Sequence, residues 1–86
     1  MLRRIYSIRD SKAELYSQPM FAHTHGEAER NFTELVNDEK SKLFQFSEDF
    51  DLYHIGDLDD STGKINSPDT PQHIAKAAHI KRPNIQ

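Results

Sequence analysis

Basic and aromatic side chains interleave most densely near the start of the chain. Arg3, Arg9 and Lys12 lie close together in sequence, and Tyr16 follows them. Cations of this kind neutralise phosphates, and an aromatic ring can stack on a base of any identity. The pattern therefore indicates contact with single-stranded nucleic acid through these four residues. Three more cations near the other end of the chain would add non-specific attraction: Lys76, Lys81 and Arg82.

The acidic segment that begins at Asp57 matches a calcium-binding loop poorly. Such a loop needs glycine at its sixth position and glutamate at its twelfth. Counted from Asp57, these positions hold Thr62 and Pro68, while Gly63 comes one place late. The segment predicts an acidic hairpin turn, with Gly63 in a left-handed conformation.

Other catalytic and metal-binding patterns are weak. His23 and His25 could share one side of an extended segment, but no spacing supplies the further ligands that a metal site needs. No nucleophile pairs with a base at a recognisable distance, and the three glycines form neither a P-loop nor a dinucleotide fingerprint. We therefore expect a protein that is not an enzyme and that needs no metal and no cofactor.

Charge is distributed unevenly along the chain, whose net charge is −3. Residues 1–12 hold four cations and one acid, residues 38–60 hold eight acids and two lysines, and residues 76–86 hold three cations and no acid. A polarised molecule can present a basic face despite a negative total. Ordinary solubilising charge would give a similar distribution, so the pattern alone leaves both interpretations open.

The length and composition predict a small domain with a thin core. Only 19 of the 86 residues are Leu, Ile, Val or Phe, close to the level of about 20% at which disorder becomes common. A homodimer would bury more apolar surface. The absence of cysteine excludes disulfides, and the early polar residues and the lack of a long apolar run lead us to expect no signal peptide and no membrane span.

The clearest element is a helix over residues 24–37. Thr24 and Glu27 fit a capping box at its start. Ala28, Phe32, Leu35 and Val36 then recur at helical spacing and form one apolar stripe.

Extended segments surround this helix. Residues 2–9 alternate, and we expect Tyr6 and Ile8 to face the core while Arg3 and Arg9 face outward. Further strands are expected over 13–21, 50–58 and 64–66, and a short helix should begin at Thr70. The predicted fold class is α+β: a small antiparallel sheet of about four strands packed against the one main helix, 24–37, with a short C-terminal helix. Residues 1–66 would form the domain, and residues 67–86 a linker, the short helix and a partly disordered tail.

Three segments also resemble a known family. They are Y-S-I-R-D-S-K-A at 6–13, G-E-A-E-R-N-F-T-E-L-V-N-D at 26–38, and E-D-F-D-L-Y-H-I-G-D-L-D-D-S-T-G-K-I at 48–65. In this order and spacing they resemble the small non-structural protein of gokushoviruses, which are Microviridae with circular single-stranded DNA genomes. The segment 40–46 departs from the family pattern, and the C-terminal tail lies outside the resemblance. The resemblance implies a DNA-binding role in the host cytoplasm during viral DNA synthesis and packaging, without assigning any residue to it.

Residues and resemblance together give one leading hypothesis. The chain is expected to be a non-enzymatic bacteriophage protein that binds single-stranded DNA, with Arg9 and Lys12 on phosphates and Tyr16 as a stacking platform. The acidic hairpin at 57–60 would lie away from the DNA, or would mimic DNA towards a protein partner. Phage replication or capsid proteins would be further partners. The alternative is a dimeric protein-interaction regulator of the replication initiator or of capsid assembly that does not touch DNA.

Overall fold

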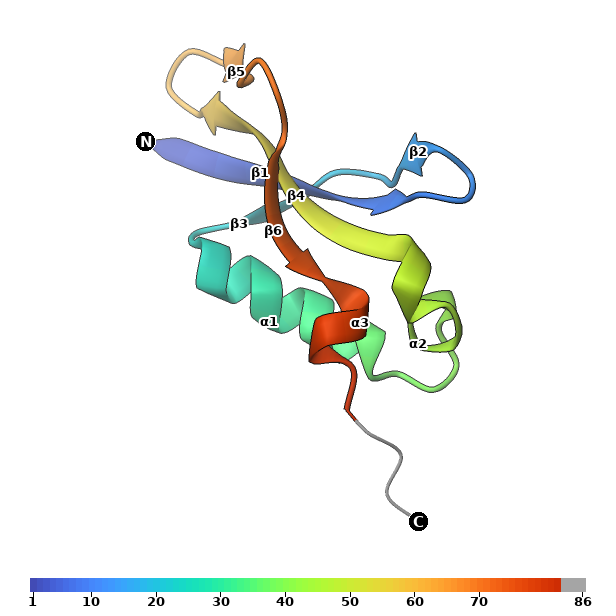
Figure 1. Cartoon of the computed structure of the whole chain (residues 1–86). Coiled ribbons are helices and arrows are strands. Elements are labelled where there is room, and N and C mark those ends of the chain that lie inside the picture. The colour runs from blue at the N-terminus through green and yellow to red at the C-terminus, as the bar shows by residue number, and fades with distance from the viewer. Residues whose placement is uncertain (83–86) are drawn as a thin grey trace.

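The computed structural model describes residues 1–82 and shows one antiparallel sheet with three α-helices and a short 3-10 helix (Figure 1). The six strands are β1 (Leu2–Asp10), β2 (Leu15–Tyr16), β3 (Met20–Ala22), β4 (Phe50–Asp59), β5 (Ile65–Asn66) and β6 (Gln72–Lys76). The helices are α1 (His25–Val36), α2 (Lys42–Gln45), the 3-10 helix η1 (Ser47–Asp49) and α3 (Ala77–Ile80). No helix within residues 1–82 combines the length and the apolar character that a membrane crossing requires.

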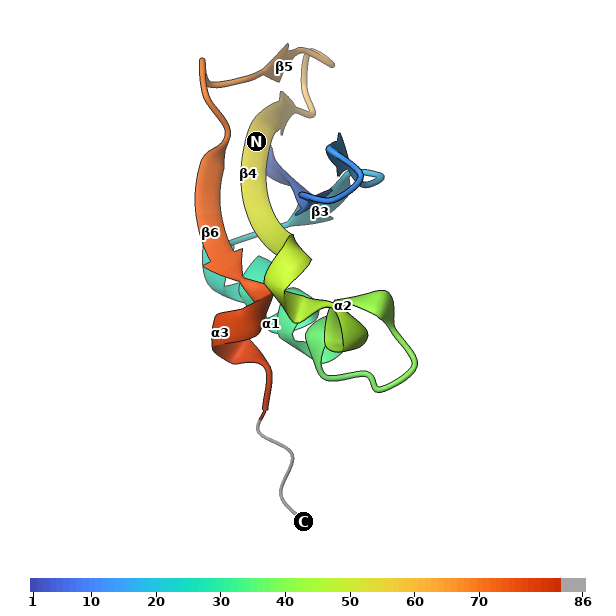
Figure 2. The same ribbon diagram turned by 45° about the vertical axis from the view of Figure 1, so that its right-hand side comes forward.

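The two long strands β1 and β4 pair at the centre of the sheet. Each edge of the sheet consists of two short strands instead of one continuous strand. β2 and β3 pair with different parts of β1, and β5 and β6 pair with different parts of β4. Figure 2 shows β6 and β3 on opposite sides of β4. The expected α+β class with about four strands is therefore wrong: the chain is mostly sheet, with six strands. Among the described helices, only α1 is longer than four residues.

Prolines explain why the edges are broken. Proline has no N–H to donate to a strand ladder, so it interrupts a strand or ends it. Pro19 separates β2 from β3 within the segment that was expected to form one strand over 13–21. Pro68 and Pro71 lie between β5 and β6 in the same way.

The main helix agrees with the prediction, because its ends are set by local capping. α1 runs from His25 to Val36, Thr24 caps it by accepting from the N–H of Glu27 at 3.0 Å, and Asn37 forms its C-cap. The Glu27 carboxylate reaches back to the backbone N–H of His23 at 3.2 Å. Side-chain oxygens thus satisfy donors that the first turn of a helix leaves without partners.

The core lies between α1 and one face of the sheet. Tyr6 and Leu52 are fully buried and meet Phe32 and Val36 of α1, as the alternation in residues 2–9 predicted for Tyr6. Leu2, which projects from the same face of β1 as Tyr6, is 58% exposed at the end of the strand. We call the sheet face that packs on α1 the inner face and the opposite face the outer face.

A β-bulge in β4 decides which side chains share a face. Ile5 pairs with Gly56 and Tyr6 pairs with His54, so Ile55 is an extra residue opposite β1. An extra residue in one strand shifts the alternation of everything that follows it. After the bulge, each side chain of β4 therefore projects from the face opposite to the one that an uninterrupted alternation would give it.

The C-terminal helix begins later than expected. Residues 72–76 form β6, and α3 covers only Ala77–Ile80. Thr70 and Pro71 resemble a helix start, but pairing of the next five residues with β4 outweighs that local preference. The division of the chain at residue 66 stays a prediction, and the part of the tail at residues 83–86 that was expected to be disordered lies outside the described residues.

Replacing Gly56 by alanine is expected to lower the free energy of unfolding by about 1–3 kcal/mol, the usual cost of overpacking. The new Cβ would lie 2.9 Å from the backbone oxygen of Asn66 and 3.3 Å from the Oγ of Ser67, so the backbone beside β4 would have to move. Urea denaturation measures the effect. The matched control is Gly26→Ala in α1, where the nearest atom is 3.8 Å away and little or no loss is expected. Equal stability of the two variants would contradict the prediction.

Candidate functional site

A row of three rings crosses the outer face. The centroids of Tyr16 and Tyr53 are 5.7 Å apart, and those of Tyr53 and His73 are 5.3 Å apart. Both contacts are edge-to-face, at interplanar angles of 69° and 81°. Tyr16 is 45% exposed and the His73 side chain 48% exposed, so surface on both outer members of the row is open to a planar ligand.

The register of the strands brings the three rings together from separate parts of the sequence. Tyr16 of β2 pairs with Arg9 of β1, and Tyr53 of β4 pairs with Ser7 of β1 and with His73 of β6. Paired and diagonal residues on one face of antiparallel strands lie within contact distance of each other. The row therefore exists only when β2 and β6 are both docked on the central pair.

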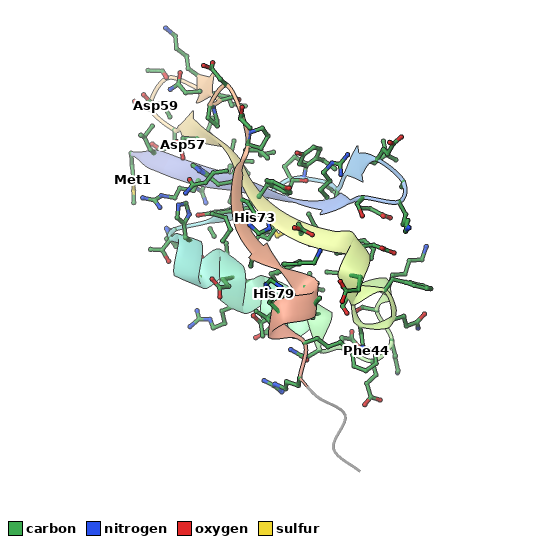
Figure 3. All side chains as sticks on the ribbon, in the orientation of Figure 1. Met1, Phe44, Asp57, Asp59, His73 and His79 are labelled. Carbon is green, nitrogen blue, oxygen red and sulfur yellow. The ribbon has the colours of Figure 1, made fainter. Side chains whose placement is uncertain are left out.

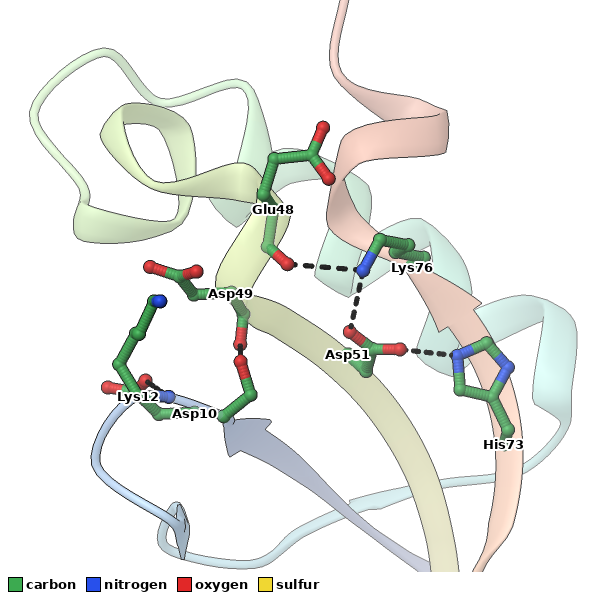
Figure 4. Close-up of polar contacts among 8 residues, drawn as sticks. Asp10, Lys12, Glu48, Asp49, Asp51, His73 and Lys76 are labelled. Atoms are coloured by element: carbon green, nitrogen blue, oxygen red, sulfur yellow. Dashed lines mark hydrogen bonds and ion pairs between the residues drawn. The ribbon is translucent and has the colours of Figure 1, made fainter.

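Two cations flank the rings. The Arg9 guanidinium carbon lies 5.8 Å from the centroid of Tyr16. The Lys76 ammonium donates to the backbone oxygen of Glu48 at 3.1 Å and lies 3.7 Å from a carboxylate oxygen of Asp51 (Figure 4). Arg9, Ser11, Asp51, Tyr53 and Lys76 line a polar hollow of about 220 Å³.

The one carboxylate in this hollow is already engaged. Asp51 contacts Lys76 through one oxygen and the Nε2 of His73 at 2.7 Å through the other (Figure 4). His73 and Lys76 are three residues apart, a spacing that puts side chains on opposite faces of a regular strand. Ile74 is an extra residue opposite β4, and this bulge turns both of them towards Asp51.

The structure brings together three of the predicted binding residues, Arg9, Tyr16 and Lys76. Arg3 lies on the same face at the other end of β1, with its guanidinium carbon 5.3 Å from the centroid of Phe21. Lys12 lies in the turn after β1 and lines a separate hollow of about 310 Å³ with Lys42, Phe46 and three further residues.

The two remaining predicted cations lie beside the helices rather than on the outer face. The Lys81 ammonium sits 4.2 Å from the ring centroid of Phe44 in α2. The backbone N–H of Arg82 donates to the Asn37 side chain at the end of α1.

Sequence reasoning also missed Tyr53, although its place between the apolar residues of the strand expected over 50–58 was a signal that it faces away from the core.

Two carboxylates of the acidic hairpin, Asp59 and Asp60, are hydrogen-bonded to other groups of the protein. Asp59 accepts from the Ser61 hydroxyl at 2.6 Å, and this hydrogen bond is the main reason that the pKa of Asp59 is lowered. Asp60 accepts from the N-terminal amine at 3.0 Å, a bond that raises the pKa of that amine. Gly63 has φ of 78°, the left-handed turn position that the sequence predicted. Within residues 1–82, no three histidine or acidic side chains gather as a metal-binding group would.

A second polar cluster lies on the inner face, above the start of α1. The Tyr6 hydroxyl and the Nδ1 of His25 are 2.6 Å apart, and the Nε2 of His54 lies 3.0 Å from a carboxylate oxygen of Asp57. The rings of His25 and His54 are in contact, with centroids 5.2 Å apart. His54 and Asp57 share this face because of the bulge at Ile55 (Asp57 is labelled in Figure 3).

Burial shifts the pKa of two members of this cluster, Tyr6 and His25. It raises the pKa of Tyr6 and lowers that of His25, and for His25 the nearby charges of Arg4 and His54 act in the same direction while Asp57 opposes them. The folded chain therefore takes up a proton on His25 less readily than the unfolded chain does.

The free energy of unfolding is expected to decrease as the pH falls below 6.5, the ordinary pKa of histidine. The unfolded chain binds a proton on His25 from that pH downward, whereas the folded chain does so only at a lower pH, so protons favour the unfolded state. Thermal melting at about pH 7 and about pH 5.5 measures the effect. His25→Gln, which can still accept from Tyr6, should show a smaller decrease than the parent, and His23→Gln in the preceding loop should not. An equal decrease in all three proteins would contradict the assignment to His25.

Comparison with known proteins gives one match. A protein-family model described as Phage ORF5 protein matches residues 3–80, from the second residue of β1 to the last residue of α3. Neither the curated proteins nor the solved structures give a significant match.

Proposed function

The chain belongs to the Phage ORF5 protein family, and from this premise we propose that it binds single-stranded DNA through the outer face of its sheet. The observation that supports this most is the row formed by Tyr16, Tyr53 and His73, with Arg9 and Lys76 in the hollow beside it. Single-stranded DNA binders combine aromatic rings for the bases with cations for the backbone.

Base stacking would use the exposed surfaces of the row. Because Tyr53 stands nearly perpendicular to both neighbours, it supports Tyr16 and His73 by its contacts while each of them keeps surface open to solvent. Stacking is tolerant of sequence, since every base has a flat apolar face. Binding should accordingly show little preference among bases.

Phosphates would bind beside the rings. Arg9 and Lys76 line the polar hollow together with Ser11, whose hydroxyl donates to the backbone oxygen of Asp49 at 3.1 Å, so the two cations are the groups that would meet an anion. The Lys76 ammonium offsets the charge of Asp51, and Arg9 adds a further positive charge. Arginine suits this role because its planar guanidinium can contact a ring and a phosphate at the same time.

The biological setting is part of the same proposal. Within the phage family, the chain is proposed to be the gokushoviral small non-structural protein, acting in the host cytoplasm when progeny single strands of Microviridae are made and packaged. Its role there would be binding without catalysis and without a cofactor.

Salt-dependent binding tests the proposal. The affinity for a labelled oligonucleotide of about 20 nucleotides should fall steeply between about 50 and 200 mM salt, because binding releases counterions from the phosphates. Arg9→Ala should weaken binding and reduce the slope of log affinity against log salt by about 0.7 for each phosphate that the variant no longer neutralises. Arg30→Ala, which removes the same charge from the exposed surface of α1, is the control and should change neither.

Two results would overturn the proposal. One is absence of binding at micromolar protein, and the other is binding that salt does not weaken. A concentration-dependent dimer that covers the outer face would then favour the alternative, a regulator that works through protein contacts.

A further inference from the structure

We propose that single-stranded DNA contacts the outer face at two stations whose rings lie about 13 Å apart along β1, an inference that rests on the function proposed above. Each station is an arginine of β1 over the ring of a residue from a neighbouring edge strand. The first is Arg9 with Tyr16, and the second is Arg3 with Phe21.

The two stations have the same construction. The guanidinium carbon lies 5.8 Å from the ring centroid in the first and 5.3 Å in the second. Tyr16 is 45% exposed and Phe21 is 48% exposed, so each ring has surface left for a base. The arginine at each ring is available for the adjoining phosphate.

Strand geometry places both stations on the outer face. Arg3 and Arg9 are separated by an even number of residues on β1, so their side chains project to the same side. Tyr16 pairs with Arg9, and Phe21 pairs with Ile5, which shares that side.

The bulge at Ile55 keeps carboxylates away from the second station. Because of the shifted alternation, Asp57 and Asp59 pair with inner-face residues of β1, and the direct neighbour of Arg3 on the outer face is Leu58. The acidic hairpin thus lies next to Arg3 in the fold, yet these two carboxylates project from the other side of the sheet.

The spacing between the stations is fixed by hydrogen bonds. The connection from β2 to β3 is anchored at Ser17, whose Oγ accepts from the backbone N–H of Ile8 at 3.0 Å. The Ser7 hydroxyl donates to the backbone oxygen of Ser17 at 2.8 Å. The two rings are therefore held at a constant separation along β1.

This separation sets a minimum length for the DNA. The rings pair with Arg9 and Ile5, and these four residues of strand span about 13 Å. A single strand covers that distance in about four nucleotide steps at the B-form rise of about 3.4 Å, and in fewer if it is stretched. A trinucleotide would therefore occupy one station, and an octanucleotide would reach both.

Titration of labelled thymidine trinucleotide and octanucleotide into the full chain tests the inference. Phe21→Ala should weaken binding of the octanucleotide by about fivefold or more and that of the trinucleotide less than twofold, because the three-ring row offers the short strand the better station. Tyr16→Ala should weaken both. Phe46→Ala, which removes an exposed ring from the hollow beside Lys12, is the control and should change neither.

Equal effects of Phe21→Ala on the two lengths, or no effect on either, would overturn the two-station arrangement while DNA binding itself stands. Arg3→Gln provides an independent variant of the same station and should reproduce the dependence on length. Melting temperatures identify any variant that has lost its fold. Failure of the parent chain to bind either oligonucleotide would reject the proposed function, and the second station with it.

Discussion

Replacing Tyr16 and Tyr53 together by alanine is expected to lower the affinity for single-stranded DNA by about a hundredfold. A ring that stacks on a base contributes about 1–3 kcal/mol to binding, and 1.4 kcal/mol corresponds to a tenfold change in affinity. Tyr53 also supports both of its neighbours in the row, so its loss should loosen His73 as well. Fluorescence anisotropy with a labelled oligonucleotide measures the change.

The matched control for this variant keeps the rings. Replacing the same two residues by phenylalanine removes only the hydroxyl groups, for which the structure shows no side-chain hydrogen bond within the described residues, and should leave the affinity nearly unchanged. The salt slope of the double alanine variant should stay close to that of the parent, because Arg9 and Lys76 are intact. If the phenylalanine variant lost as much affinity as the alanine variant, stacking would not be the basis of binding.

Replacing Phe32 by alanine is expected to remove most of the free energy of unfolding of the chain. Phe32 is fully buried at the centre of the core, and removing a buried phenylalanine costs about 3–5 kcal/mol. Small domains have a total stability of only about 5–15 kcal/mol, and a thin core places this one near the lower end. Circular dichroism during urea denaturation gives the free energy of unfolding.

Leu35 offers a control in the same helix. It is 41% exposed, so Leu35→Ala should cost much less than Phe32→Ala while changing helix propensity by a similar small amount. Similar losses from the two substitutions would contradict the assigned position of the core.

The stability of the fold and the proposed binding depend on different faces of one sheet. Core residues of β1 and β4 project from the inner face, whereas the rings and arginines project from the outer face. Alternation along a strand makes this separation possible in so short a chain. Substitution of the exposed outer-face rings Tyr16 and Phe21 should therefore change DNA affinity with little effect on stability, and the reverse should hold for Phe32.

Local signals in the sequence determined several features. Capping and apolar spacing predicted the helix over 24–37, and α1 begins and ends within one residue of those limits. Alternation predicted the strand over residues 2–9 and the burial of Tyr6, because a strand with one side in the core must show a period of two. The strand expected over 50–58 is β4. Gly63 was predicted to take a left-handed turn conformation, and its positive φ confirms this.

The outer face was only partly predictable. Arg9 and Tyr16 lie next to each other because a short hairpin joins their strands, and sequence reasoning can anticipate a contact of that kind. Lys81 and Arg82 were grouped with them by charge alone, and the structure places them beside α2 and α1 instead. Charge along a chain does not specify position in space.

Tertiary pairing decided the rest. The six strands replaced the expected four because the prolines split the edges, and residues 72–76 became a strand because they pair with β4 rather than because of their own preference. The bulges at Ile55 and Ile74 reversed the alternation after each of them, which put Lys76 on the same outer face as His73 and turned Asp57 to the inner face. A bulge arises from the fit between two strands that are distant in sequence, so neither strand encodes it alone. The sequence by itself determined the elements and the kinds of residue available for binding, and only the tertiary structure decided which of those residues share a face.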